Sequence, residues 1–321
     1  MKRIRYSYVK HTQHLDDINE MAVEAPRELI DYCESQYRDN IQDIADYLAA
    51  QRKKYRVIML SGPSASGKTT TSKILSELLG GHGIKTEIIS LDNFYLGRGQ
   101  APKLENGEYD YESVHALDLP LMEETLTALI KTGQCQMPIF DFPAGKPSTD
   151  KTPIALGEDD VAIVEGIHAL NPLIADPLPQ DRLLRMYISV KQGIRNEREE
   201  DVLTAQDIRL LRRTVRDYAF RASSVENTFT MWEQVMRGEI EYIQPYKWNA
   251  DITINSVHMY EPCIMAEGIQ KLLEEVTADS RFYEKAQRLL GALEQFHPIP
   301  QAMVPENSLL KEFIGGGIYW S

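Results

Sequence analysis

Four residues at fixed spacing, Gly62, Gly67, Lys68 and Thr69, could bind the phosphate groups of a nucleotide. They fill the pattern G-x-x-x-x-G-K-[ST], in which backbone N–H groups and a helix N-terminus surround an anion. Lys68 would add a positive charge, and Thr69 would offer its hydroxyl to Mg²⁺. We therefore expect a site for ATP and Mg²⁺. The predicted nucleotide-binding residues of this loop are Gly62, Ser64, Ser66, Gly67, Lys68, Thr69 and Thr70.

Two carboxylates could complete a phosphoryl-transfer site. Asp92 follows a predicted strand, and Glu165 ends another. In an open α/β sheet the carboxyl ends of adjacent strands form the ligand crevice, so both acids should face the phosphate loop. Phosphoryl transfer needs a carboxylate to accept the proton of the attacking hydroxyl and cations around the transferred group. We assign Asp92 as this base, and Glu165 with Thr69 to the metal.

An arginine cluster could cover the phosphates. Its side chains recur at helical spacing, which places several guanidinium groups on one surface: Arg209, Arg212, Arg213, Arg216 and Arg221. The acids close to them in sequence are Asp207, Asp217 and Glu226. One interpretation is a helical lid, around residues 204–225, that closes on ATP phosphates. The other is a solvated face with surface ion pairs, which contribute little to stability.

The elements that must position these groups alternate between strands and helices, which predicts an α/β fold with a mostly parallel sheet and helices on both faces. The phosphate loop lies between a strand and a helix, as its pattern requires. Residues 97–114 and 142–160 are predicted to be long loops. The predicted strands are residues 56–60, 86–91, 161–165, 184–190 and 251–254. The predicted helices are residues 15–51, 67–79, 119–131, 208–221, 226–243, 263–276 and 281–295.

The fold prediction divides the chain into three segments. Residues 1–52 form a helical N-terminal extension, residues 53–260 a P-loop domain, and residues 261–321 a C-terminal helical extension packed on that domain. The apolar, aromatic residues 314–320 are expected to dock on the body of the protein or on a partner, and a homo-oligomer contact is one interpretation.

Composition limits the possible partners. A formal charge of −13 without a long Lys/Arg block argues against nucleic acid as a partner. Because no stretch reaches the ~18 apolar residues of a membrane span, we expect no membrane partner and a cytoplasmic protein. The three cysteines, Cys33, Cys135 and Cys263, lack CxxC spacing, which predicts reduced thiols.

The ordered set of motifs resembles the uridine kinase and phosphoribulokinase family of P-loop kinases. This resemblance is carried by residues 62–70, 90–95, 109–112, 116–118, 138–142, 165–170 and 209–221. Further similarities, from Trp232 to residues 310–316, point to a bacterial nucleoside-kinase branch. In that branch this domain follows a threonyl-tRNA-synthetase-like part, which we expect to be missing here.

The resemblance implies roles for individual residues. Asp92 would deprotonate the 5′-hydroxyl of a nucleoside, uridine or cytidine first, with Lys68 as the second catalytic residue. The residues implied to bind the acceptor are Tyr95, Glu112, Phe140, Phe142 and Arg213. Those implied to cover the phosphates of ATP are Arg213, Arg216 and Arg221.

Three positions in the acceptor region depart from the family pattern and leave the acceptor open. Glu112 stands where an aspartate is usual, Phe140 replaces a tyrosine, and Gly145 stands about where the family has a histidine. Because a site without these polar groups discriminates less strongly between analogues, another small alcohol, such as pantothenate, a sugar or a sugar phosphate, is a second possibility. A third is a regulatory ATPase that binds nucleotide without an acceptor.

Overall fold

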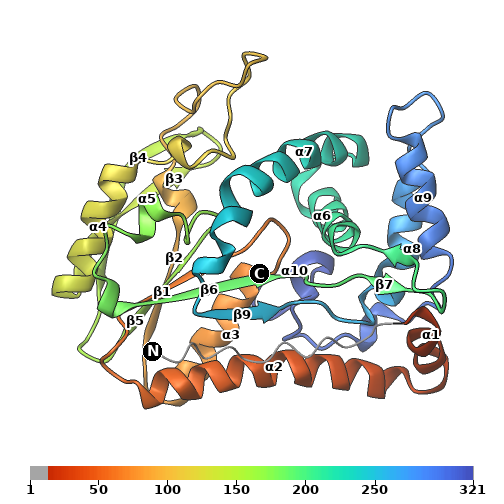
Figure 1. The fold of residues 1–321 in the computed structure, drawn as a ribbon, viewed down its shortest axis with the longest axis horizontal. Coiled ribbons are helices and arrows are strands. Elements are labelled where there is room, and N and C mark those ends of the chain that lie inside the picture. The colour runs from red at the N-terminus through yellow and green to blue at the C-terminus, as the bar shows by residue number, and fades with distance from the viewer. Residues whose placement is uncertain (1–13, 321) are drawn as a thin grey trace.

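The protein is built around a five-stranded parallel sheet with the strand order β2-β5-β1-β6-β9 (Figure 1). The computed structural model describes residues 14–320. The predicted N-terminal extension is therefore described only from residue 14, since residues 1–13 lie outside this range. The sheet strands are β1 (Val57–Ser61), β2 (Thr86–Ser90), β5 (Val161–Glu165), β6 (Leu183–Ser189) and β9 (Ile252–Asn255). All five occur where the sequence predicts strands, and the predicted α/β fold is confirmed.

Helices cover both faces of the sheet because its central strands are apolar on both sides. Alternate residues of β1 point to opposite faces: Ile58 and Leu60 belong to one core, and Val57 and Met59 to the other. The long helices are α1 (Leu15–Glu24), α2 (Pro26–Ala50), α3 (Lys68–Gly81), α4 (Leu119–Thr132), α6 (Ala205–Arg221), α7 (Val225–Gly238), α8 (Glu261–Leu273) and α9 (Tyr283–Leu293). Two single-turn helices, α5 (Pro172–Ala175) and α10 (Lys311–Ile314), complete the set in the described range.

The helix predicted over residues 15–51 is interrupted. It consists of α1 and α2, which meet at the non-helical residue Ala25. Pro26 begins α2, and a proline disfavours the helical conformation in the residue before it. The long α2 then packs against α3, the helix that follows the phosphate loop (Figure 1).

The prediction of a loop over residues 142–160 is wrong for most of its length. Strands β3 (Gln134–Asp141) and β4 (Lys146–Ala155) form an antiparallel hairpin outside the main sheet. Most of β4 is exposed and polar and contains Pro147 and Pro153, so it lacks the apolar alternation by which strands are recognised. A second small ribbon joins β7 (Ile194–Arg195) to β8 (Asp201–Leu203).

The helix predicted over residues 226–243 ends early. After Gly238 the chain continues as a π-helical turn over Glu239–Ile243 and a 3₁₀ turn over Gln244–Asn249. Pro245 lies at the start of that 3₁₀ turn and cannot donate a backbone hydrogen bond, so the α-helical ladder cannot extend through it.

The three predicted segments share one hydrophobic core. It contains Ile30 of α2, Ile58 of β1 and Phe313 of α10, which come from the N-terminal, central and C-terminal segments. The division into a P-loop domain with two extensions therefore stays a prediction. Within residues 14–320, no helix has the length and apolarity to cross a bilayer.

Candidate active site

A cavity of about 230 Å³ lies at the carboxyl ends of the central strands, beside the phosphate loop. It brings together most of the predicted site residues. Those that line it are Ser64, Ser66, Gly67, Lys68, Thr69, Asp92, Tyr95, Glu112, Glu165, Arg216 and Arg221. The remaining predicted site residues lie outside its lining: Gly62, Thr70, Phe140, Phe142 and Arg213.

The phosphate loop has the conformation that its glycines permit. A Cβ at Gly62 would lie 2.2 Å from the carbonyl oxygen of Ile188, so only glycine fits against β6. Gly67 has φ +87° and leads into α3, in the left-handed conformation that glycine adopts most readily. The buried hydroxyl of Ser66 has no hydrogen-bond partner within residues 14–320. A bound phosphate oxygen would supply that partner.

Lys68 begins α3 and is half-buried, with Nζ 3.2 Å from the carbonyl oxygen of Pro63, to which it donates. Burial lowers the pKa of its ammonium, while the negative charges of Glu165 and Asp92 oppose that shift. A desolvated cation beside two carboxylates can stabilise charge on a transferring phosphoryl group more strongly than a cation in water.

Thr69 and Glu165 form the oxygen pair expected for the metal. The Thr69 hydroxyl donates to Glu165 Oε1 at 3.3 Å, and Glu165 is buried at the end of β5. Burial raises the pKa of the Glu165 carboxyl, and Lys68 lowers it in part. Hard oxygen donors suit Mg²⁺, which usually takes one or two protein ligands together with substrate phosphates. This donor set therefore fits a phosphate-bound magnesium ion.

Asp92 lies in a short 3₁₀ turn, Leu91–Phe94, directly after β2. Its backbone N–H donates to Ser90 Oγ at 3.3 Å, which fixes the start of the turn. The residue is exposed at the cavity mouth, but the protein packed around its carboxyl group raises the pKa. The nearby charges of Lys68 and Arg221 lower it in part. A carboxylate with a raised pKa is a better proton acceptor.

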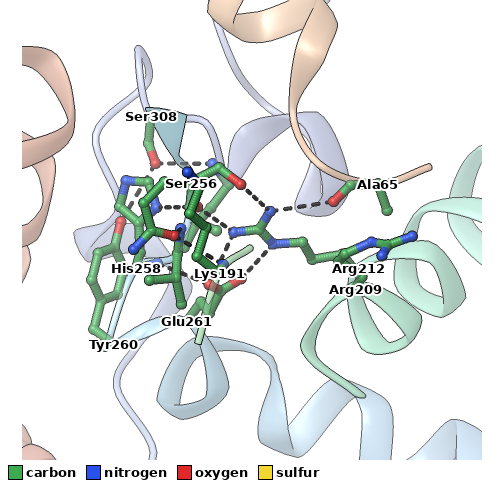
Figure 2. A network of polar contacts seen from close by, with 12 residues as sticks. Ala65, Lys191, Arg209, Arg212, Ser256, His258, Tyr260, Glu261 and Ser308 are labelled. Carbon is green, nitrogen blue, oxygen red and sulfur yellow. Dashed lines mark hydrogen bonds and ion pairs between the residues drawn. The ribbon is translucent and has the colours of Figure 1, made fainter. Parts of the chain in front are cut away.

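The arginine helix α6 is held by acids that are distant in sequence. Arg209 Nη2 lies 2.6 Å from Glu239 Oε2, and Arg212 is bound by Glu261 at the start of α8 (Figure 2). The sequence pattern points only to acids that are near these arginines in the chain. Because Glu239 and Glu261 already neutralise Arg209 and Arg212, the interpretation that the whole cluster closes on ATP phosphates is wrong for these two residues. Both are buried structural groups.

The other three arginines share one carboxylate, that of Asp217. Their nitrogens lie at 3.0 Å for Arg213, 2.8 Å for Arg216 and 3.4 Å for Arg221. Arg213 Nη1 also donates to Ser64 Oγ of the phosphate loop at 2.9 Å. Three cations around one acid leave an excess of positive charge at the loop, which is available to an anion.

Aromatic rings border the predicted acceptor side. Tyr95 lines the cavity and contacts the edge of Phe140, with ring centroids 5.9 Å apart. Phe140 in turn contacts Phe142 at 5.1 Å, and Phe142 is largely exposed. Phe140 and Phe142 therefore extend a series of ring contacts from Tyr95 onto the β3–β4 hairpin. Burial raises the pKa of the Glu112 carboxyl, and the charge of Arg213 lowers it in part.

Sequence reasoning missed Glu312, which also lines the cavity. It belongs to α10, and its carboxylate accepts a hydrogen bond from Thr70 Oγ1 at 2.6 Å. The two residues are 242 positions apart, so no motif or local spacing could join them. His168 is buried near Glu112, and burial lowers the pKa of its imidazole to about 4. It is therefore a neutral group at neutral pH.

A family model and individual known proteins with similar sequences all point to the same protein family. The family described as "Phosphoribulokinase / Uridine kinase family" matches residues 57–261. A uridine kinase of Anoxybacillus flavithermus is 30% identical over 227 residues, covering 70% of this chain and 98% of the relative. A uridine kinase of Deinococcus deserti is 28% identical over 209 residues, covering 65% and 91%. Among solved structures, a possible uridine kinase from Bacillus stearothermophilus is 22% identical with a TM-score of 0.40, covering 47% of this chain and 80% of that one.

The parallel sheet, the phosphate loop and the acids at the strand ends define a P-loop kinase. The chain belongs to the phosphoribulokinase and uridine kinase family, and is a phosphotransferase that acts on an alcohol.

Proposed function

We propose that this protein is an ATP- and Mg²⁺-dependent kinase that phosphorylates the 5′-hydroxyl of a nucleoside, with uridine and cytidine as the first candidates. The observation that carries the proposal is the position of Asp92. Its carboxyl group faces the same cavity as Lys68 and the Thr69–Glu165 pair. A base beside a phosphate-binding loop is the arrangement for transfer to a hydroxyl, not for simple nucleotide binding.

In this proposal the protein supplies a proton acceptor, positive charges and ligands for a metal ion. Asp92 accepts the proton of the acceptor hydroxyl as that oxygen bonds to the γ-phosphorus, and the bond to the β,γ-bridging oxygen breaks to release ADP. Lys68, Arg216 and Arg221 stabilise the charge on the transferred group. Thr69 and Glu165 would hold Mg²⁺, which neutralises phosphate charge when it is bound.

The acceptor side suits a ring attached to a hydroxylated sugar. Glu112 lines the cavity and can accept hydrogen bonds from sugar hydroxyls. The rings of Tyr95, Phe140 and Phe142 form an edge-to-face series leading out of the cavity, which offers a stacking surface for a planar base. The names of the relatives, uridine kinases, support the same class of acceptor.

An acceptor screen tests this proposal. With labelled ATP and Mg²⁺, we expect phosphate transfer to uridine or cytidine, and less or none to pantothenate, sugars or sugar phosphates. The 5′-deoxy analogue is the matched control, since it keeps the base and the other hydroxyls but lacks the reacting oxygen. Transfer to a sugar or to pantothenate alone would refute a nucleoside acceptor. ATP hydrolysis that no alcohol alters would favour a regulatory ATPase.

Replacing Lys68 with alanine should weaken both nucleotide binding and turnover, because the same ammonium contacts bound and transferring phosphates. We expect kcat/KM to fall by about 10²–10³, the usual effect of removing one group that stabilises a transition state. Calorimetric titration with MgADP and steady-state kinetics measure the two effects. Lys85→Ala, at an exposed position just before β2 and outside the cavity lining, is the matched control. Equal affinity in wild type and Lys68→Ala would contradict the assignment.

A further inference from the structure

The last part of the chain packs against the phosphate loop and its helix. We define the C-terminal segment as residues 305–320, and Figure 1 shows it ending beside α10 and α3. Leu309 fills the space next to Gly67, where an added Cβ would lie 2.3 Å from Leu309 Cδ1. The indole Nε1 of Trp320 donates to Thr70 Oγ1 at 3.0 Å, and Lys73 Nζ lies 4.5 Å from the centre of the Trp320 ring. The segment thus contacts the first two turns of α3.

One residue of the C-terminal segment enters the nucleotide cavity itself. The Glu312 carboxylate accepts from Thr70 Oγ1 and lines the same cavity as Lys68 and Arg221. Thr70 directly follows the phosphate-binding pattern, in the first turn of α3, where backbone and hydroxyl groups are directed at a bound phosphate. The structure therefore places an anionic side chain of the protein beside groups that would otherwise serve the anionic nucleotide.

The cavity receives a negative charge from Glu312, which opposes the positive charge that Arg216 and Arg221 bring beside the phosphate loop. Its lining has three cations, Lys68, Arg216 and Arg221. It has four carboxylates, Asp92, Glu112, Glu165 and Glu312, so the formal charge is 3 − 4 = −1. Without Glu312 it would be zero. Like charges repel strongly where solvent is limited, so the Glu312 carboxylate and the donor phosphates disfavour each other.

The size of the cavity points in the same direction. Sites for small molecules commonly measure about 300–1,000 Å³, whereas this cavity of about 230 Å³ would have to hold a nucleotide and an acceptor. Withdrawal of a side chain that lines the cavity would enlarge the space for both molecules. The α6 side is fixed by the buried Arg209–Glu239 and Arg212–Glu261 pairs. The C-terminal segment has the means to move, because three consecutive glycines, residues 315–317, separate Glu312 from Trp320.

We propose that the C-terminal segment competes with the donor nucleotide, and that Glu312 and Trp320 withdraw from Thr70 when the nucleotide binds. The movement is local, since Leu309 and Phe313 are fully buried and remain in the core. The segment is then an autoinhibitory contact that lowers the affinity of the empty enzyme for its donor. This inference rests on the nucleotide site of the proposed function.

The first test is the affinity for MgADP, measured by titration calorimetry. Glu312→Gln keeps the shape of the side chain but removes the charge, and we expect it to bind MgADP about tenfold more tightly. Glu306→Gln is the matched control, because it removes the same charge from an exposed position of the C-terminal segment and should leave affinity unchanged. Unchanged or weaker binding by Glu312→Gln would overturn the proposal.

The second test asks whether the C-terminal segment moves away when the nucleotide binds or stays in place as a fixed part of the site. In the free protein the amide of Ile318 donates to the Glu306 carbonyl and that of Trp320 to the Gly317 carbonyl. Hydrogen exchange of these amides should accelerate when MgADP binds, while exchange in the phosphate loop slows. Slower exchange at both places would mean that the segment closes on the nucleotide, which overturns the proposal. If wild-type protein, Glu312→Gln and Glu306→Gln all fail to bind MgADP, the proposed function itself fails.

Discussion

Replacing Asp92 with asparagine should lower kcat by about 10²–10⁴, the usual contribution of a general base, while affinity for MgADP changes little. Asparagine keeps the size of the side chain and the backbone hydrogen bond to Ser90, so the turn that carries it should persist. What is lost is the capacity to accept the proton of the attacking hydroxyl. Kinetics with saturating ATP and acceptor measure kcat, and calorimetry measures the affinity.

The pH profile gives a second readout of the same variant. Only the deprotonated carboxylate accepts a proton, and burial raises the pKa of Asp92 above its ordinary value. In wild type, kcat should therefore be low at pH values below that raised pKa and increase as the pH rises through it. This low-pH decrease is the acid limb of the profile. Asp92→Asn should lack this acid limb. Asp150→Asn, on the exposed strand β4, is a matched control that should retain both kcat and the limb. Near-normal turnover by Asp92→Asn would show that Asp92 is not the base.

The sheet and the phosphate loop could be predicted from the sequence because their signals are local. The run from Val57 to Leu60 is fully buried and apolar, and the loop after it has glycines where contacts and backbone conformation demand them. Strand ends also place Asp92 and Glu165, since parallel strands direct their carboxyl ends to one edge. These features need no knowledge of residues far along the chain.

The features that sequence reasoning missed depend on contacts between distant residues. Glu239 and Glu261 neutralise Arg209 and Arg212 across 30 and 49 positions, which no helical spacing reveals. Glu312 reaches the cavity from the other end of the chain. The β3–β4 hairpin escaped for a different reason, because its exposed second strand has no apolar alternation. Such pairings are set by tertiary packing, not by local pattern.

Removing the carboxylate of Glu261 should destabilise the protein by about 3–5 kcal/mol, because it leaves a buried guanidinium without its partner. Arg212 is fully buried, and its Nε and Nη2 lie 2.6 and 3.0 Å from the two carboxylate oxygens of Glu261. Nη2 also donates to the Ser256 carbonyl at 2.6 Å, and Nη1 to that of Ala65 at 3.3 Å. Figure 2 shows how this one side chain links the phosphate loop, α6, the loop after β9 and α8.

Urea unfolding of Glu261→Ala tests this expectation, with the exposed pair Arg281–Glu233 as its control. That pair has a similar distance of 3.0 Å, but both side chains are more than half exposed, so Glu233→Ala should change stability by less than about 1 kcal/mol. The double variant Arg212→Met/Glu261→Leu should lose less than the sum of its single variants, since it removes both charges together. Additive losses would show that the two residues are not coupled. Because Arg212 also binds the Ala65 carbonyl, Glu261→Ala should weaken MgADP binding even where the protein remains folded.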